Sequence, residues 1–521
     1  MRARYHGEPL TTTEKKALPF KKAGPGTTPS FGFMFGGLTN DANNRLPEGP
    51  ATVQALRDLG VAMAEDPSNE ESGIPAAYTY FGQFIDHDIT KTVFDPSLQP
   101  PDGTDPIEDA NLKPIAANTV TGLIQNARTT PLDLDSLFGG PAVNTVNPAD
   151  GTMALGEVSP APFGTIPTAD KKHDLPRKPM ILNPANAAQQ EADRQAIIGD
   201  PRNDENLLVA QLHVGFIRAF NALVRRGEAN PQVALRRRYQ WAMLHDFLPR
   251  IGLNSVVNDV LKSGPTFWKV ANAGALFMPI EFAAAAYRFG HSMIRGSYSH
   301  NQTFDPAGFN FFFTFTALSG DLQPGQGHNV QSPTLPDNWI IEWQRFFGSA
   351  VTPASINPAR RIDANLTPAL GLLRDFEGVP ITGIMAHLAA RNLLRGYLLG
   401  LPTGQAVAKH LGVAPLSIDV LRAATPSGLG QSIGDAGLLE RTPLWFYILA
   451  EAGDPARGKP NGQSLGEVGT RIVAETLWTL AKFASDSVID TPPSDAELAS
   501  GEFTLKGIIK LGLDPQLAGV P

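Results

Sequence analysis

The sequence predicts an all-α protein, mainly helical with long loops, built around one large domain. Apolar residues recur at helical spacing in several separate stretches, of which 465–484 is the last. No alternation of strand and helix patterns and no internal repeat is found. Loop-like stretches rich in Pro, Gly, Asp and Asn separate the helices, and 94–190 is the longest. We expect an extended N-terminal arm over residues 1–50, a main domain over 51–486 and a C-terminal tail over 487–521.

The composition is typical of a globular protein, and it excludes some classes of binding partner. A net charge of -8 offers no basic surface for nucleic acid. No stretch has the roughly 18 apolar residues of a membrane span, and the N-terminus lacks the apolar core of a signal peptide. The chain has no cysteine, which excludes disulfides and thiolate ligation of a metal or haem. We expect no nucleic-acid partner, no membrane span, and either a cytoplasmic location or export by a non-classical route.

Two helices are expected early in the main domain, over residues 51–65 and 76–90. On the second, Gln83, Asp86 and His87 share one face, because residues three and four apart are neighbours on a helix. Asp88, the next residue, lies about 100° further round the helix, so one helix can contribute side chains to two sites. Taken alone, the pattern also fits a surface helix with scattered charges.

A group of hard oxygen ligands lies within the longest loop-like stretch. Thr129, Asp133 and Asp135 are closely spaced and have backbone carbonyls between them. Such a set suits Ca²⁺, which takes about six to eight oxygen atoms. The glycine and closing glutamate of an EF-hand are missing, so this is not that motif. A solvated acidic turn fits the spacing equally well.

A further helix is expected to begin at Asn203 or Asp204, either of which can cap it. Arg202 and Glu205 are three residues apart at its start and lie on the same side. Glu205 also suits the positive end of the helix dipole, so a purely structural role is an alternative. Another helix is expected over residues 233–247.

Two later helices, over residues 281–295 and 382–397, each carry a polar residue that needs a partner. The first is rich in alanine and places Arg288 and His291 on one side. A lone histidine of this kind is more often a satisfied core residue than a metal ligand. The second places Asn392 among apolar residues, where an imidazole N–H would satisfy its amide.

Taken together, these residues describe one site between two histidines. His87 has Gln83 and Arg202 as possible companions, and His291 has Asn392 to orient its ring. A haem between the two would use His291 as its iron ligand. His87 would then be left to act as acid and base.

On these residues the chain resembles the animal-type haem peroxidase superfamily, known from myeloperoxidase, lactoperoxidase and peroxidasin, in a bacterial form. The resemblance runs from about residue 75 to about 485, with its motifs in the family's order. It implies roles at these positions: His87 as distal histidine, Gln83 as distal glutamine, Arg202 as distal arginine, His291 as proximal iron ligand, Asn392 as its partner, Arg288 and Arg395 as haem-propionate contacts, and Asp88, Thr129, Pro131, Asp133 and Asp135 as calcium ligands.

The resemblance further implies haem b and Ca²⁺ as cofactors of a haem peroxidase domain. Asp86 and Glu205 match the carboxylates that form ester links to the haem in the mammalian enzymes. Myeloperoxidase has a methionine after the second carboxylate, and that methionine makes a sulfonium link. This chain has Asn206 there, so the sulfonium bond is excluded.

The implied activity is that of a peroxidase. H₂O₂ would form an oxo-ferryl haem, which then oxidises small organic molecules, with halide or thiocyanate as further reductants because Gln83 matches the residue beside the family's halide site. His87 would transfer the peroxide proton. Arg202 would stabilise the charge that develops as the O–O bond breaks. The reductant and the oligomeric state are left open.

Three alternatives compete with a peroxidase. A fatty-acid dioxygenase of the same superfamily needs a tyrosine three residues before the proximal histidine, and that position is Arg288 here, with Tyr287 one residue away. A non-catalytic haem- or calcium-stabilised adhesion protein would not need His87, Arg202 and His291 together. A metal-free structural protein would have to bury the polar side chains of the predicted site without a ligand to satisfy them.

Overall fold

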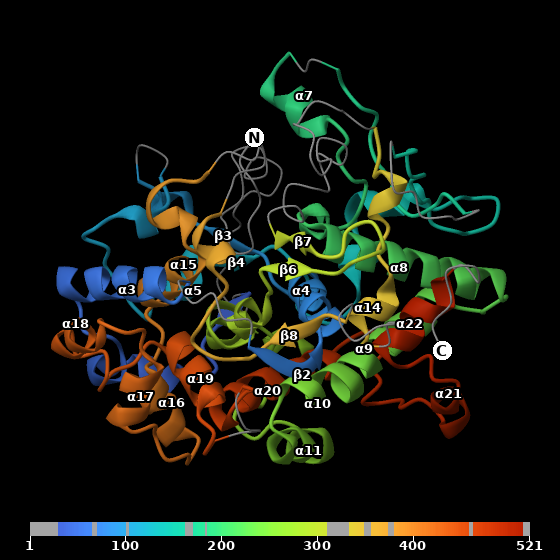
Figure 1. Cartoon of the computed structure of the whole chain (residues 1–521). Coiled ribbons are helices and arrows are strands. Elements are labelled where there is room, and N and C mark those ends of the chain that lie inside the picture. The colour runs from blue at the N-terminus through green and yellow to red at the C-terminus, as the bar shows by residue number, and fades with distance from the viewer. Residues whose placement is uncertain are drawn as a thin grey trace.

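The computed structural model describes residues 30–64, 70–100, 104–161, 170–182, 185–309, 333–348, 356–373, 380–457 and 462–513. Within them the chain is mainly helical, which confirms the all-α prediction (Figure 1). The described strands are short and pair in two-stranded sheets. These are β1 (Phe31–Gly32) with β5 (Met278–Pro279), β2 (Glu71–Pro75) with β8 (Pro358–Arg360), β3 (Thr92–Phe94) with β4 (Ile124–Asn126), and β6 (Ser297–Tyr298) with β7 (Ala307–Gly308). The first pair is parallel and the others are antiparallel.

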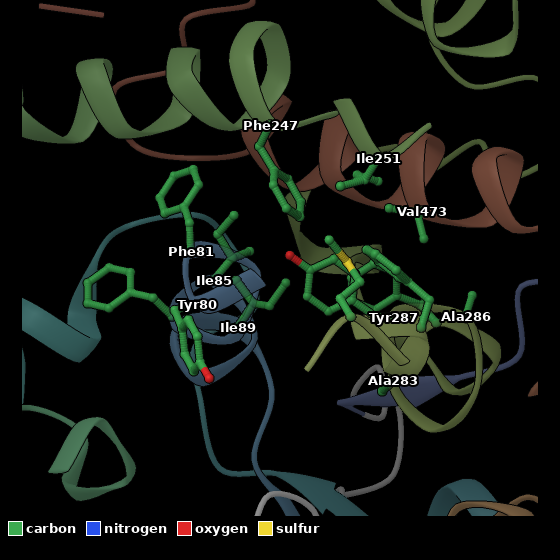
Figure 2. Packing of buried hydrophobic residues seen from close by; sticks show 14 of the residues in the cluster. Tyr80, Phe81, Ile85, Ile89, Phe247, Ile251, Ala283, Ala286, Tyr287 and Val473 are labelled. Carbon is green, nitrogen blue, oxygen red and sulfur yellow. The ribbon is translucent and has the colours of Figure 1, made fainter. Parts of the chain in front are cut away.

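Helix α4 (Ala77–Ile89) crosses the interior, as expected for residues 76–90 (Figure 1). All of its residues are buried except Gly82 and Gln83. Its aromatic side chains pack against α8 (Leu207–Arg225), and the rings of Phe84 and Phe216 stack with centroids 4.7 Å apart. Figure 2 shows Phe81 and Ile85 of α4 among the buried apolar side chains. Polar groups on α4 therefore have to be satisfied inside the protein.

Helix α8 is long and apolar enough to cross a membrane by composition. However, 83% of its most apolar window is buried within the protein, where it packs against α4, α9 (Pro231–Ala242) and α22 (Leu505–Gly512). We therefore assign it as a core helix.

The remaining helices surround this centre. They are α2 (Gly36–Thr39), α3 (Pro50–Ala62), α5 (Val120–Leu123), α6 (Asp135–Phe138), α7 (Ala187–Ala192), α10 (Leu248–Ile251), α11 (Asn254–Ser263), α12 (Ile280–Ala284), α14 (Trp343–Phe346), α15 (Leu388–Leu398), α16 (Gly404–His410), α17 (Ile418–Ala424), α18 (Gly430–Asp435), α19 (Leu444–Gly453), α20 (Glu467–Lys482) and α21 (Asp495–Ala499). Helix α15 approaches α3 so closely that a Cβ on Gly60 would lie 2.3 Å from the Ala390 Cα. This contact fixes the helix that carries Asn392.

The single helix predicted over residues 281–295 is wrong in one respect. It breaks at Ala285, between α12 and a 3₁₀ helix, η8 (Ala286–Met293). The Arg288 Nε donates to the Ala283 carbonyl at 3.0 Å, and so takes an acceptor that a continuous α-helix would pair with the amide of residue 287. In a 3₁₀ helix residues three apart eclipse one another, so Arg288 and His291 still share a side.

The described parts of the arm and the tail pack against the main body. In the arm, the amides of Met34 and Phe35 donate to the buried Glu281 carboxylate at 2.8 and 3.0 Å. In the tail, α22 lies against α8, where a Cβ on Gly512 would lie 2.4 Å from that of Arg218. The predicted domain boundaries remain predictions.

Candidate active site

A cavity lies between α4 and η8, and its empty volume of about 740 Å³ includes space that is open to solvent. Its wall is mostly apolar, and four of the predicted site residues contribute to it: Gln83, Asp86, Glu205 and His291. Gly290 also lines the cavity, and a Cβ there would meet no atom within 4 Å.

One wall holds the predicted proximal pair. His291 and Asn392 are both buried, and the His291 Nδ1 lies 2.8 Å from the Asn392 Nδ2. The Asn392 Oδ1 faces the Arg288 Nη1 at 3.4 Å. With the amide nitrogen toward the ring, Nδ1 is the acceptor and the imidazole proton is on Nε2. A half-turn of the amide reverses this bond, so that Nδ1 donates and Nε2 has a lone pair for a metal.

Positive charge collects beside this pair. Burial, with Arg395 and Arg202 nearby, lowers the pKa of the Arg288 guanidinium to about 10. Arg395 forms an ion pair with Asp105 at 2.9 Å, but its Nη1 is buried with no hydrogen-bond partner. Arg395 therefore has one buried donor without a partner, as expected of a site for an anionic group.

The opposite wall holds Gln83 and Glu205. The Gln83 amide nitrogen donates to the Glu205 Oε1, and the Asn206 amide nitrogen donates to the Gln83 Oε1 at 3.1 Å. The other carboxyl oxygen of Glu205 is buried and has no partner. Burial raises the pKa of Glu205 well above its usual range, against the opposing charge of Arg202. A carboxyl group with one oxygen that has no hydrogen-bond partner therefore lines the cavity.

His87 lies behind this wall and is fully buried. It is absent from the residues that line the cavity, and its Nε2 lies 3.6 Å from the Glu205 Oε1. Glu205 thus connects His87 to the cavity. The sequence did not indicate that the Gln83 and Glu205 side chains would pair in front of the histidine.

Asn203 orients His87, although the sequence indicated only a capping role for it. Its Oδ1 lies 2.8 Å from the His87 Nδ1, and its Nδ2 lies 2.9 Å from the Nδ1 of His213. The cap of α8 is instead Asn206, which accepts from the Val209 amide. Burial lowers the pKa of His213 to about 3, so its ring is neutral and accepts from the amide NH₂. The amide oxygen then accepts from the His87 Nδ1, and Nε2 is left as the basic nitrogen.

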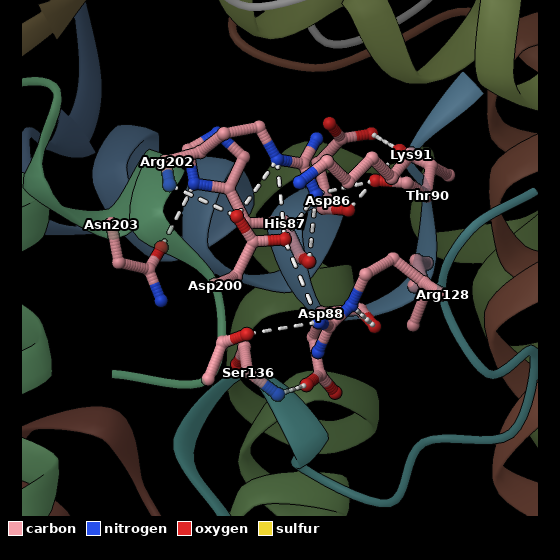
Figure 3. A network of polar contacts seen from close by, with 12 residues as sticks. Asp86, His87, Asp88, Thr90, Lys91, Arg128, Ser136, Asp200, Arg202 and Asn203 are labelled. Carbon is pink, nitrogen blue, oxygen red and sulfur yellow. Dashed lines mark hydrogen bonds and ion pairs between the residues drawn. The ribbon is translucent and has the colours of Figure 1, made fainter. Parts of the chain in front are cut away.

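Arg202 fixes the end of α4. Its Nη2 donates to the carbonyls of His87 and Thr90 at 2.9 and 2.6 Å, and to the Asp200 carboxylate at 2.8 Å (Figure 3). Like His87, it does not line the cavity. In this arrangement it holds the backbone that carries the histidine. No role for Asp200 was predicted from the sequence, because its importance depends on the contact of Arg202 with α4.

The residues predicted to bind calcium are engaged with other partners. Asp88 accepts from the Ser136 amide at 3.0 Å. Asp135 accepts from the Thr129 hydroxyl at 2.6 Å and also from the Arg128 Nη2. The oxygen atoms of both carboxylates are therefore directed to donors of the protein itself.

The other two predicted calcium ligands, Pro131 and Asp133, also have partners within the protein. The Pro131 carbonyl accepts from the amide of Asp133, at 2.9 Å, and the Asp133 carboxylate accepts from the Ser485 amide at 3.1 Å. Across the ranges that the structure describes, no group of three or more His, Cys, Asp or Glu side chains is placed to hold a metal ion. This donor set does not fit calcium as it is arranged.

The cavity residues, by contrast, fit a haem. The space is lined by a buried histidine with an amide partner and by Glu205, one oxygen of which has no hydrogen-bond partner. Arg288 and the Arg395 Nη1, which has no hydrogen-bond partner, suit anionic propionates. All of the predicted haem-binding residues lie on this cavity or beside it.

Comparison with known proteins finds similarity in fold and not in sequence. No protein-family model and no curated protein sequence matches the chain. The chain shares its fold with a solved peroxidase.

Peroxidase A from Dictyostelium discoideum matches with a TM-score of 0.52 and 16% identity, over 89% of this chain and 90% of that one. The fatty acid alpha-dioxygenase of Arabidopsis thaliana matches with a TM-score of 0.47 and 12% identity, over 88% and 74%. The fatty acid alpha-dioxygenase of Oryza sativa matches with a TM-score of 0.47 and 13% identity, over 87% of this chain and 76% of that one. The first match shows the fold alone, and the dioxygenase matches do not bear on the reaction.

Proposed function

We propose that the chain is a haem peroxidase, an oxidoreductase that uses H₂O₂ to oxidise small organic molecules, with halides or thiocyanate as further reductants. One observation carries the proposal. A single cavity lies between the His291–Asn392 pair and the Gln83–Glu205 pair, with His87 directly behind the latter.

When bound, the haem would supply the redox chemistry with peroxide. His291 would hold its iron, with Asn392 orienting the ring. Arg288 and Arg395 would bind its propionates. Asp86 and Glu205, which line the cavity, are the candidates for ester links. Formation of an ester at either residue would require H₂O₂ as a two-electron oxidant.

His87 is assigned the proton transfer. Its Nδ1–H is held by Asn203, so Nε2 is the nitrogen that takes a proton from one peroxide oxygen and returns it to the other as water leaves. Glu205 lies between Nε2 and the cavity, and an ester at Glu205 would release Gln83 from its present hydrogen bond. Arg202 holds the backbone of His87 in place. No step is assigned to calcium.

Asn203→Leu tests the orienting role. We expect the variant to bind haem like the parent but to react more slowly with H₂O₂, because either ring nitrogen of His87 can then carry the proton. The pH dependence of the reaction rate should also change, which a purely structural defect would not cause. Stopped-flow absorbance across a pH series measures both quantities. An unchanged rate and pH profile would contradict the assignment of Nδ1.

A dioxygenase remains the second candidate because of Tyr287. Its hydroxyl group is buried without a hydrogen-bond partner and lines the same cavity as His291, and Figure 2 shows the ring facing α4. A cavity with a buried phenol and apolar walls also suits an alkyl chain.

Two assays on the haem-loaded protein separate the candidates. Oxidation of a phenol that requires H₂O₂ supports the peroxidase. Oxygen uptake that requires a long-chain fatty acid, without phenol oxidation, supports the dioxygenase. Absence of both would contradict the proposed function.

A further inference from the structure

Arg128 is an inward-facing cation at the loop that resembles a calcium site. Only 9% of its side chain is exposed. Its Nε donates to the carbonyl of Asp88 at 3.3 Å, its Nη1 to the Gly199 carbonyl at 3.4 Å, and its Nη2 to the Asp135 carboxylate. The same Nη1 lies 3.6 Å from the Asp200 carboxylate. Figure 3 shows the arginine beside Asp88.

These contacts join three segments that are distant in the sequence. Asp88 lies in the last turn of α4, Asp135 begins α6, and Asp200 precedes Arg202. Asp88 and Asp200 are fully buried, and Arg202 already pairs with Asp200 at 2.8 Å. Arg128 adds a second cation 3.6 Å from Asp200 and reaches the other two segments as well, because a guanidinium stays charged and its planar donors reach several acceptors at once.

We propose that the Arg128 guanidinium is the built-in cation that fixes α4 to the loop of residues 129–139, in the place where the superfamily resemblance implies Ca²⁺. The two cations are alternatives here, because the Asp135 oxygen that faces Arg128 is one that calcium would need. The other Asp135 oxygen already accepts from Thr129.

Arg128 thereby acts as a positioning residue for His87. Asp88 is the next residue along α4, and Asp200 holds the arginine that binds the His87 carbonyl. The rotation of α4 and the loop would then be set without a metal. This inference does not depend on haem binding, and it can be tested on the full chain without haem.

The first test measures calcium on the parent protein. We expect less than one-tenth of an equivalent of Ca²⁺ after equilibrium dialysis at about 5 mM CaCl₂, which is above the ~10⁻⁴–10⁻³ M of weak protein calcium sites. The melting temperature should be the same in CaCl₂ and in EGTA. One bound equivalent, or a melting temperature that falls in EGTA, would overturn the proposal.

The second test removes the charge with Arg128→Met. We expect a lower melting temperature in EGTA and a partial recovery in CaCl₂, because calcium can then bind the released carboxylates. Arg218→Met is the matched control, since Arg218 also joins distant segments through Asp170 and the Gly512 carbonyl. The control should lose stability without gaining a calcium response. An Arg128→Met protein as stable as the parent would overturn the proposal, and if this variant does not fold, the calcium content of the parent decides.

Discussion

His291→Ala is expected to abolish stable haem binding. The imidazole is the buried histidine of the cavity wall, and its Asn392 partner has no other ring to orient. Without it the iron loses its protein ligand, and propionate contacts to Arg288 and Arg395 would give only weak binding. Titration of the purified variant with haem, followed by absorbance, measures the loss against the parent.

Two further variants make this result specific. His245→Ala removes an exposed histidine that does not line the cavity, and it should bind haem like the parent. Asn392→Leu should retain the ligand but weaken haem binding by about 10–100-fold, as is typical when the partner of a metal-binding histidine is removed. Parental haem affinity in His291→Ala would show that the iron ligand lies elsewhere.

His87→Ala is expected to keep the haem and to lose reactivity toward peroxide. His87 does not line the cavity, so its removal leaves the predicted haem contacts in place. Loss of a positioned acid–base group typically costs about 10²–10⁴-fold in rate. The measurement is the second-order rate constant for the absorbance change after mixing with H₂O₂.

The haem spectrum of His87→Ala before peroxide is added provides the internal control. A parental spectrum with a slow reaction locates the defect in proton transfer. A variant that reacts at the parental rate would show that His87 is not the base, and it would leave Asp86 and Glu205 as the carboxyl groups that line the cavity.

Helices with one polar and one apolar side were predictable from the sequence, and others were not. The expectation for residues 76–90 agrees with α4, and that for 465–484 with α20. Helix α19 gave no such signal because it is buried nearly all round and lacks a polar side. The break at Ala285 depends on the Arg288 side chain reaching the Ala283 carbonyl, which helical spacing does not reveal.

In the candidate site, too, some contacts were predictable from the sequence and others were not. The pairing of His291 with Asn392 was predictable because a buried histidine and a buried asparagine each need a partner. The roles of Asn203 and Arg128 were missed, since each depends on residues brought close only by folding. Asn203 also looked like a helix cap, and Arg128 only preceded the acidic loop. The predicted roles of His87 and Arg202 stay predictions, because both lie behind the cavity wall.

The most direct test of the central claim is the absorption spectrum of the purified protein supplied with haem, recorded before and after H₂O₂ and again after acid–organic extraction. We predict a Soret band that remains with the protein and shifts when peroxide is added. A band that shifts but is extracted would retain the peroxidase and remove the ester role from Asp86 and Glu205. No Soret band after reconstitution would contradict the account, because the cavity beside His291 would then not be a haem site.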